Sequence, residues 1–220
     1  KFHLESSGDG LVMDEGHGWG ADLKISKSGT HNAKDGDWVH AKISSWPNSK
    51  EGFIGEVSDI IGDISDPLTD DKRVLYAHRI PMEFSKETLK EVAGFKPEVE
   101  KNDLLNRNDL THLPFVTIDG ATAKDFDDAV CVQKTSEGFI AWVGIADVSH
   151  YVKEKTALDK DAYERGNSTY FPNFVVPMLP EILSNELCSL RPNIPRLAVV
   201  AEVHLDWQGV VKNSLFHEAV

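Results

Sequence analysis

Four aspartates occur within ten residues, between the end of one apolar run and the start of the next, and this feature constrains the fold more than any other. The first run, Phe115 to Ile118, is partly β-branched, and a loop of mostly small residues follows it. The second run starts at Ala129. The pattern predicts a strand, a turn and a second strand, with all four carboxylates at that corner. The aspartates are Asp119, Asp125, Asp127 and Asp128.

Carboxylates this close together repel one another unless a cation lies among them. Hard oxygen ligands suit Mg²⁺ or Mn²⁺, which bind protein carboxylates together with the phosphates of a substrate. The cluster therefore predicts a metal site for phosphoryl chemistry, with the four aspartates as its ligands.

The same cluster is compatible with simpler roles. Aspartate-rich loops are common as solvated turns, and Asp-Gly is a frequent turn dipeptide. A calcium-binding EF-hand loop starting at Asp119 would need glycine at its sixth position and glutamate at its twelfth, which hold Lys124 and Val130. An aspartic protease motif would leave three of the aspartates unexplained. The calcium loop fails, whereas the solvated turn stays open.

The composition is that of an ordinary globular protein, with 220 residues, 40% hydrophobic and 27% charged. This length predicts one large domain or two small ones. No apolar stretch approaches the roughly 20 residues that span a bilayer, and no leader marks export. Cys131 and Cys188 do not have the spacing of a metal site or a redox motif, so we expect both side chains to be buried. This use of cysteine predicts a cytoplasmic protein. Because the first residue is Lys1 rather than methionine, we expect a fragment.

The net charge argues against a nucleic-acid ligand. The chain carries 36 acidic and 23 basic side chains, a balance of −13. This charge repels a polyanion unless metal ions or a local groove reverse it. Either the substrate is not a nucleic acid, or the basic surface lies on parts of the protein outside this chain.

Residues 1–64 predict a small OB-like β-barrel, because short alternating runs are separated by Gly, Asp and Ser turn signals. The runs are Leu11–Met13, Ala21–Ile25, Asp37–Ile43 and Gly52–Val57. A polar linker is expected over residues 63–73. A helix is expected from Lys86 to Ala93, capped by Ser85 and ended by Gly94.

The second half of the chain predicts a sheet with a few helices. Ala129–Val132 and Phe139–Ile145 are nearly continuous apolar strands, so we expect their sheet to be covered on both faces. Thr156 and Gly166 bound a predicted helix over residues 157–165. Three prolines should hold residues 170–180 extended, and residues 198–207 and 210–217 alternate as a hairpin over Gln208-Gly209.

Four motifs in the second half of the chain together resemble the signature of the ribonuclease II (RNB) superfamily catalytic domain. They are Phe115–Val130, Ile145–Val152, Arg165–Pro172 and Val176–Pro192. The aspartate motif is more similar to the ribonuclease R branch than to ribonuclease II itself, and residues 1–64 resemble, more loosely, the second cold-shock barrel of that branch. The expected fold class is therefore α+β. It comprises an OB-like (cold-shock) barrel over 1–64, a linker and helical connection over 65–112, and the N-terminal part of a mixed α/β RNB domain over 113–220.

The resemblance implies a 3′-to-5′ exoribonuclease that hydrolyses single-stranded RNA to nucleoside 5′-monophosphates with Mg²⁺, for which Mn²⁺ can substitute. It makes all four aspartates catalytic residues and metal ligands, with Asp127 helping to position the second metal or the attacking water. Tyr170 matches an aromatic residue that stacks on the terminal bases. His150 and Arg165 are candidates for RNA contacts, although a structural role is the simpler interpretation. Asp147 is a candidate for a turn cap or a support of the metal ligands.

The resemblance further implies that this fragment alone is inactive, because the family's catalytic domain continues beyond Val220 with a basic residue and a second stacking aromatic. We expect a monomer with no membrane partner and no small-molecule cofactor. Two alternatives stay open. One is a catalytically silent RNA-binding or scaffold protein with the same fold, and the other is a metal-dependent enzyme acting on a different phosphate ester.

Overall fold

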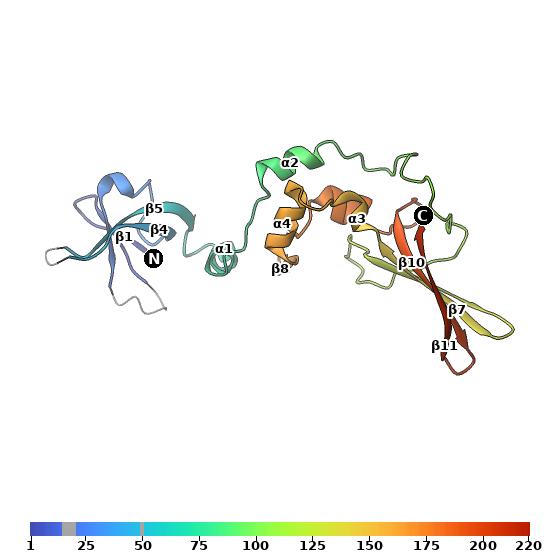
Figure 1. Cartoon of the computed structure of the whole chain (residues 1–220). Coiled ribbons are helices and arrows are strands. Elements are labelled where there is room, and N and C mark those ends of the chain that lie inside the picture. Colours follow the sequence, from blue (N-terminus) through green and yellow to red (C-terminus); the bar gives the residue numbers. More distant parts are fainter. Residues whose placement is uncertain (15–20, 49–50) are drawn as a thin grey trace. The chain divides into compact units, whose positions relative to one another are not determined.

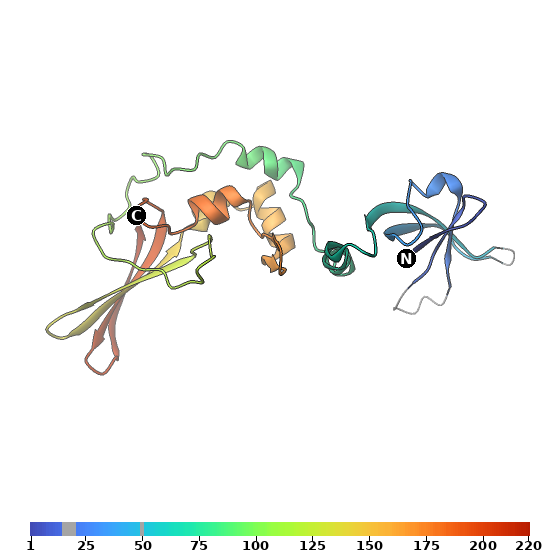
Figure 2. The same ribbon diagram turned by 180° about the vertical axis from the view of Figure 1, so that it is seen from behind.

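The structure, a computed structural model, describes residues 1–14, 21–48 and 51–220 and divides into two compact units (Figures 1 and 2). The first unit is Lys1–Met82 and the second is Glu83–Val220. Within the described residues, no helix combines the length and the apolar character needed to cross a bilayer.

The first unit is a five-stranded barrel, as the sequence predicted. Its strands are β1 (Phe2–Leu4), β2 (Gly10–Val12), β3 (Leu23–Ile25), β4 (Trp38–Ser45) and β5 (Phe53–Gly62). They lie in the order β1-β2-β3-β5-β4, and only the β3–β5 pair is parallel. The Phe2 N–H donates to the carbonyl of Asp37 at 2.8 Å, and the Gly36 N–H donates to the carbonyl of Phe2 at 2.9 Å. These bonds join β1 to the entry of β4, so the sheet closes on itself as in an OB-like barrel.

The barrel is filled by a small apolar core. Phe2, Ile25, Ala33 and Val57 are buried there. A side chain at Gly10 would place its Cβ 2.3 Å from the Phe2 ring, so glycine is what lets this ring lie across β2. A short 3₁₀ turn, η1 (Lys27–Gly29), lies on the connection between β3 and β4.

The polar linker predicted over residues 63–73 is wrong, because much of it belongs to helix α1 (Pro67–Ala77). The Asp66 carboxylate accepts a hydrogen bond from the Leu68 N–H at 3.0 Å, and Pro67 occupies the first turn. An Asp cap followed by proline is a helix start, and this local signal outweighs the polar composition. Leu75 is buried, and the Arg73 guanidinium lies 3.4 Å from the centre of the Trp38 ring of β4, so α1 packs on the barrel.

The second unit is built on an antiparallel sheet of four strands in the order β11-β10-β7-β6. The strands are β6 (Asp128–Lys134), β7 (Gly138–Ala146), β10 (Ala198–Asp206) and β11 (Val211–Ala219). The predicted hairpin over Gln208-Gly209 is confirmed as β10–β11, and the two predicted apolar strands pair with each other as β6–β7. Helices gather at one end of this sheet, and the two hairpin turns lie at the other end (Figures 1 and 2).

The two predicted helices of the second unit begin and end close to where their caps predicted, as α2 (Lys86–Val92) and α4 (Ala157–Arg165). The short helix α3 (Val148–Tyr151) and the π-helical segment η2 (Ile182–Leu187) were not predicted. Ser85 caps α2, and Thr156 caps α4 by accepting from the Asp159 N–H at 3.2 Å. Gly166 ends α4 with a φ of 71°, a conformation that glycine adopts without strain. Cys188 is buried beside Leu158, Leu183 and Leu187, under these helices.

The described residues cover only one face of the four-stranded sheet. For this part of the chain, the prediction that both faces are covered is wrong. Cys131, Trp142 and Val200 point to the covered face, where the segment 110–115 and Leu190 pack on them. On the other face Val132, Ile145 and Phe216 are exposed, Phe216 by 75%. The apolar runs thus correctly indicated strands with one buried face. They carry no information on which segment covers the second face of the sheet. Both cysteines are buried and unpaired, as predicted.

Candidate active site

The four aspartates lie on a loop, residues 119–128, that we call the acid loop. The predicted strand over Phe115–Ile118 is reduced to one bridge, in which Val116 and Val130 exchange backbone hydrogen bonds of 2.9 Å. This bridge still closes the loop into a corner. Asp128 opens β6, where it pairs with Ile145 of β7.

The second half of the acid loop is anchored to the rest of the unit. Backbone groups of Lys124 and Phe126 bond to the hydroxyl of Ser189, and the Leu190 N–H donates to the Phe126 carbonyl at 2.8 Å. The Ala146 N–H donates to the carbonyl of Asp127 at 2.9 Å. Among the described residues, the only backbone hydrogen bond recorded within 117–123 is the local one from the Ala123 N–H to the Gly120 carbonyl. Asp125, Asp127 and Asp128 therefore have fixed backbones, whereas the Asp119 end lacks such anchors.

The carboxylates of the acid loop influence one another electrostatically. Partial desolvation, followed by the charges of Asp125, Asp128 and Asp119, raises the pKa of Asp127, even though the residue stays exposed in part to solvent. The charges of the other three predicted site residues thus all reach Asp127.

The four side chains are nevertheless not assembled into a metal site. Within the described parts of the chain, no three His, Cys, Asp or Glu side chains are arranged so that they could hold an ion. The Asp119 end of the loop lacks the backbone anchors that hold the other half. The donor chemistry still fits Mg²⁺, since four carboxylates on one short loop are hard oxygen ligands.

Tyr170 lies against the acid loop, a contact that the sequence did not predict. Tyr170 belongs to β8 (Thr169–Tyr170), which pairs with β9 (Val175–Val176). The segment expected to be extended therefore turns back on itself, with Phe171 and Phe174 stacked 4.7 Å apart. The Tyr170 hydroxyl donates to Oδ2 of Asp125 at 2.9 Å, and this hydrogen bond is the main cause that raises the pKa of Tyr170. Tyr170 is 68% exposed, which excludes a core role.

Asp147 and His150 belong to a polar network where β7 ends and α3 begins. Asp147 and Arg107 form an ion pair of 2.5 Å with 6% and 7% of their side chains exposed. The Asp147 carboxylate also caps α3 by accepting from the His150 N–H at 3.2 Å and from the Ser149 hydroxyl at 2.7 Å. His150 Nε2 lies 3.1 Å from Asp103. The structural interpretation of His150 and the cap predicted for Asp147 are therefore supported by these contacts.

Arg165 likewise has structural partners. Its Nη1 donates to the carbonyl of Pro177 at 3.1 Å, and its guanidinium lies 3.9 Å from the centre of the Phe84 ring. The bond to Pro177 ties the end of α4 to the residue that follows β9, the second strand of the hairpin that carries Tyr170. Within the described residues, these contacts indicate that Arg165 holds neighbouring segments of the chain in place.

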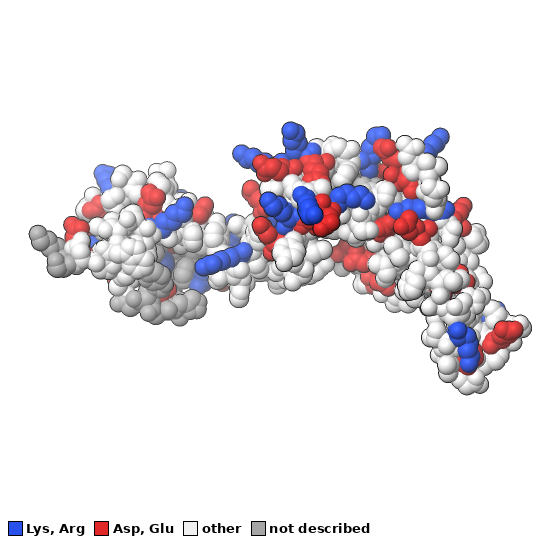
Figure 3. Space-filling view, in the orientation of Figure 1, with Lys and Arg blue, Asp and Glu red and all other residues white. Residues whose placement is uncertain are grey.

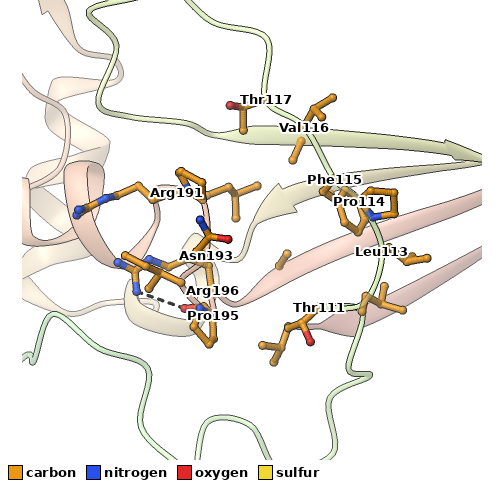
Figure 4. A pocket seen from close by; sticks show the side chains of 18 of the residues that line it. Thr111, Leu113, Pro114, Phe115, Val116, Thr117, Arg191, Asn193, Pro195 and Arg196 are labelled. Atoms are coloured by element: carbon orange, nitrogen blue, oxygen red, sulfur yellow. Dashed lines mark hydrogen bonds between the residues drawn. The ribbon is translucent and has the colours of Figure 1, made fainter.

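Two hollows of the second unit lie beside the acid loop. The larger, of about 850 Å³, is bounded by the segments 110–117 and 190–196 and does not include the aspartates among its lining residues (Figure 4). The smaller, of about 610 Å³, is lined by Lys124 and Phe126 of the acid loop together with Glu186 and Arg191, which form an ion pair. Lys and Arg side chains are interspersed with acidic ones over the face of the molecule shown in Figure 3.

Two residues whose contacts hold the acid loop and the end of β7 were missed in the sequence. Ser189 was part of a recognised motif but had no assigned role, and Arg107 was not singled out. A lone polar residue inside the apolar stretch Leu187–Leu190 was a usable signal, because a buried hydroxyl has to find partners. No comparable signal marks Arg107.

Comparison with known proteins identifies the class to which this fold and loop belong. The family model described as the RNB domain matches residues 107–220, and the model described as a cold shock domain matches residues 14–85. Because the first match covers more than half of the chain, the chain belongs to the RNB domain family. The resemblance found in the sequence is confirmed.

Within this family the chain is ribonuclease R-like. It is 39% identical to ribonuclease R of Vibrio parahaemolyticus over 221 residues, which cover 100% of this chain and 26% of that protein. The structure of Mycoplasma genitalium RNase R in complex with double-stranded RNA matches with a TM-score of 0.83 and 32% identity, over 90% of this chain and 35% of that one. The same protein in complex with ribose-methylated single-stranded RNA matches with a TM-score of 0.83 and 29% identity, over 95% and 35%. The chain therefore spans about a quarter of the curated relative's length.

Proposed function

We propose that the protein to which this chain belongs is a 3′-to-5′ exoribonuclease that hydrolyses single-stranded RNA to nucleoside 5′-monophosphates. The observation that carries the proposal is the acid loop with the exposed Tyr170 ring hydrogen-bonded to Asp125. A carboxylate cluster beside an exposed aromatic ring suits a substrate with both phosphates and bases, because bases stack on aromatic rings. The similarity to RNase R structures that contain RNA supports the same substrate class.

In this proposal Asp119, Asp125, Asp127 and Asp128 hold Mg²⁺, which lowers the pKa of bound water and stabilises charge on a phosphate. Asp125 and Asp127 leave the loop on either side of Phe126, whose N–H and carbonyl are both anchored, so their side chains start from fixed points. Tyr170 keeps the Asp125 carboxylate oriented through its hydroxyl and presents its ring to the RNA. Arg107 and Asp147 hold the end of β7, and the Ala146 N–H there anchors Asp127.

We also propose that the 220-residue chain is inactive by itself. It spans 26% of the length of its Vibrio relative. The protein in this proposal is a cytoplasmic monomer that needs no small-molecule cofactor, and its two buried, unpaired cysteines suit a reducing compartment.

The test uses the full-length protein with a 5′-labelled single-stranded RNA and Mg²⁺. Attack from the 3′ end shortens the labelled RNA step by step, whereas attack from the 5′ end would release the label at once as a mononucleotide. The variant Asp127→Asn should lose activity by about 10²–10³-fold, the usual effect of removing one preorganised charge. Asp109→Asn is the matched control, because Asp109 is an exposed residue bonded only to its own turn at Thr111.

Each alternative predicts a different result from this assay. A catalytically silent scaffold would bind the RNA without shortening it. An enzyme for another phosphate ester would leave RNA intact but hydrolyse a small ester substrate. Undiminished release of nucleotides by Asp127→Asn would contradict the assigned role of the acid loop.

A further inference from the structure

Ser189 is a fully buried polar residue whose hydroxyl reaches across the acid loop. It is 0% exposed. Its Oγ accepts a hydrogen bond from the Phe126 N–H at 3.1 Å and donates one to the carbonyl of Lys124 at 2.6 Å. The two backbone groups belong to the residues on either side of Asp125. The Ser189 hydroxyl thus donates one hydrogen bond and accepts another, and both go to the backbone that flanks a proposed metal ligand.

The backbone next to Ser189 makes a third bond to the same loop. The Leu190 N–H donates to the carbonyl of Phe126 at 2.8 Å, so both polar backbone groups of Phe126 are bound by consecutive residues of one segment. Phe126 immediately precedes Asp127. The directions in which the Asp125 and Asp127 side chains leave the backbone are therefore set by the segment 189–190.

Ser189 is itself held in place from behind. The Nε of Arg196 donates to its carbonyl at 3.2 Å, and the Arg191 N–H donates to the same oxygen at 2.8 Å. Arg196 is buried, and its Nη1 also donates to the carbonyl of Pro195 at 3.3 Å (Figure 4). The Ser189 N–H donates to the carbonyl of Glu186 at the end of η2 at 3.2 Å. The hydroxyl consequently has little freedom to follow a moving loop.

We propose that Ser189 is a positioning residue that locks the backbone around Asp125, so that the Asp125 and Asp127 carboxylates are presented together for a divalent metal ion. This inference rests on the proposed function and adds to it a residue far away in sequence. It also accounts for the contrast within the acid loop, because the half that Ser189 holds is anchored and the half around Asp119 is not. Residues that orient metal ligands without touching the metal typically change metal affinity by about 10–100-fold when they are replaced.

The experiment compares the 220-residue wild-type chain with Ser189→Ala, Ser189→Thr and Ser184→Ala. Ser184 is the matched control, because it lies on η2 and its hydroxyl bonds only to Asn185. Amide hydrogen exchange at Phe126, resolved by NMR without metal, measures the lock directly. Mn²⁺ binding, followed by the loss of the free-ion EPR signal, measures its effect on the carboxylates.

Ser189→Ala should exchange the Phe126 amide at least about fivefold faster, since its acceptor is lost, and bind Mn²⁺ about tenfold more weakly or worse. Ser189→Thr keeps the hydroxyl and should retain both values even if the extra methyl group lowers the melting temperature. Ser184→Ala should match the wild type in both.

The inference is overturned if Ser189→Ala lowers only the melting temperature and leaves Phe126 exchange and Mn²⁺ affinity unchanged. If Ser189→Ala does not fold, amide exchange in the wild-type chain tests the inference. A Phe126 amide that exchanges without protection would show that Ser189 does not hold this backbone, whereas a protected amide supports the inference. If the wild-type chain binds no Mn²⁺, the metal site of the proposed function fails for this chain. The exchange of Phe126 in Ser189→Ala then still decides the positioning role.

Discussion

Replacing Asp147 with alanine should destabilise the second unit more than most single substitutions. The change leaves the Arg107 guanidinium buried without its partner, with only 7% of its side chain exposed. Removing one member of a buried ion pair costs about 3–5 kcal/mol, and losing a helix cap costs about 1 kcal/mol more. We therefore expect a loss of about 4–6 kcal/mol for Asp147→Ala, a large part of the stability of a typical domain.

The assay is urea unfolding followed by the NMR signals of residues 83–220, which separates the second unit from the barrel. Asp147→Asn keeps the cap acceptor for the His150 N–H and should lose less than Asp147→Ala. The pair Arg107→Met with Asp147→Leu should also lose less, because no charge stays buried. Lys96→Met, which breaks an exposed ion pair with Glu100, should leave the midpoint nearly unchanged. A loss below about 1 kcal/mol for Asp147→Ala would refute the reasoning, since the pair would then behave like an exposed one.

The same residue gives the unfolding free energy a defined pH dependence. Burial by itself would raise the pKa of Asp147, but the Ser149 hydroxyl and Arg107 outweigh it and hold the pKa below the ordinary value of 3.8. A carboxyl with a lowered pKa stabilises the fold fully above its unfolded pKa, and this contribution is lost as the pH falls toward the folded pKa. The wild type should therefore lose stability between about pH 5 and pH 3, and Asp147→Asn should lose less over that range.

Three further substitutions test the packing around the site. Leu183→Ala, which truncates a fully buried side chain of η2, should cost about 2–5 kcal/mol in urea unfolding, and a loss below about 1 kcal/mol would contradict its place in the core. Gly138→Ala should cost about 1–3 kcal/mol, because its φ is 147° and the new Cβ would lie 2.1 Å from the Leu205 carbonyl oxygen, and unchanged chemical shifts along β10 would contradict this. Burial would raise the pKa of Asp161, but hydrogen bonds, that of the Ser85 N–H foremost, keep it below 3.8. Asp161→Asn should therefore reduce the acid sensitivity of the α2–α4 contact, as measured by amide exchange of α2 at pH 7 and pH 4.

The local elements of the second unit were readable from the sequence. The helix caps Ser85, Thr156 and Gly166 act on residues within four positions of themselves, so their side chains and φ preferences suffice to set those helix ends. The hairpins were also predictable, because alternation and a turn signal are properties of neighbouring residues. Helix α1 was missed even though its signal was present, since the polar composition of residues 63–73 was given more weight than the Asp66-Pro67 start.

The sequence by itself determined the family, the barrel and the set of four aspartates, because motif spacing and strand periodicity are written along the chain. The tertiary structure alone decided how the acid loop is held. Ser189 bonds to the Phe126 N–H across 63 residues, and Tyr170 bonds to Asp125 across 45. It alone also decided that Arg107 pairs with Asp147, 40 residues away. Such contacts depend on which surfaces pack together, and packing is set by the burial of many distant side chains at once rather than by any local pattern.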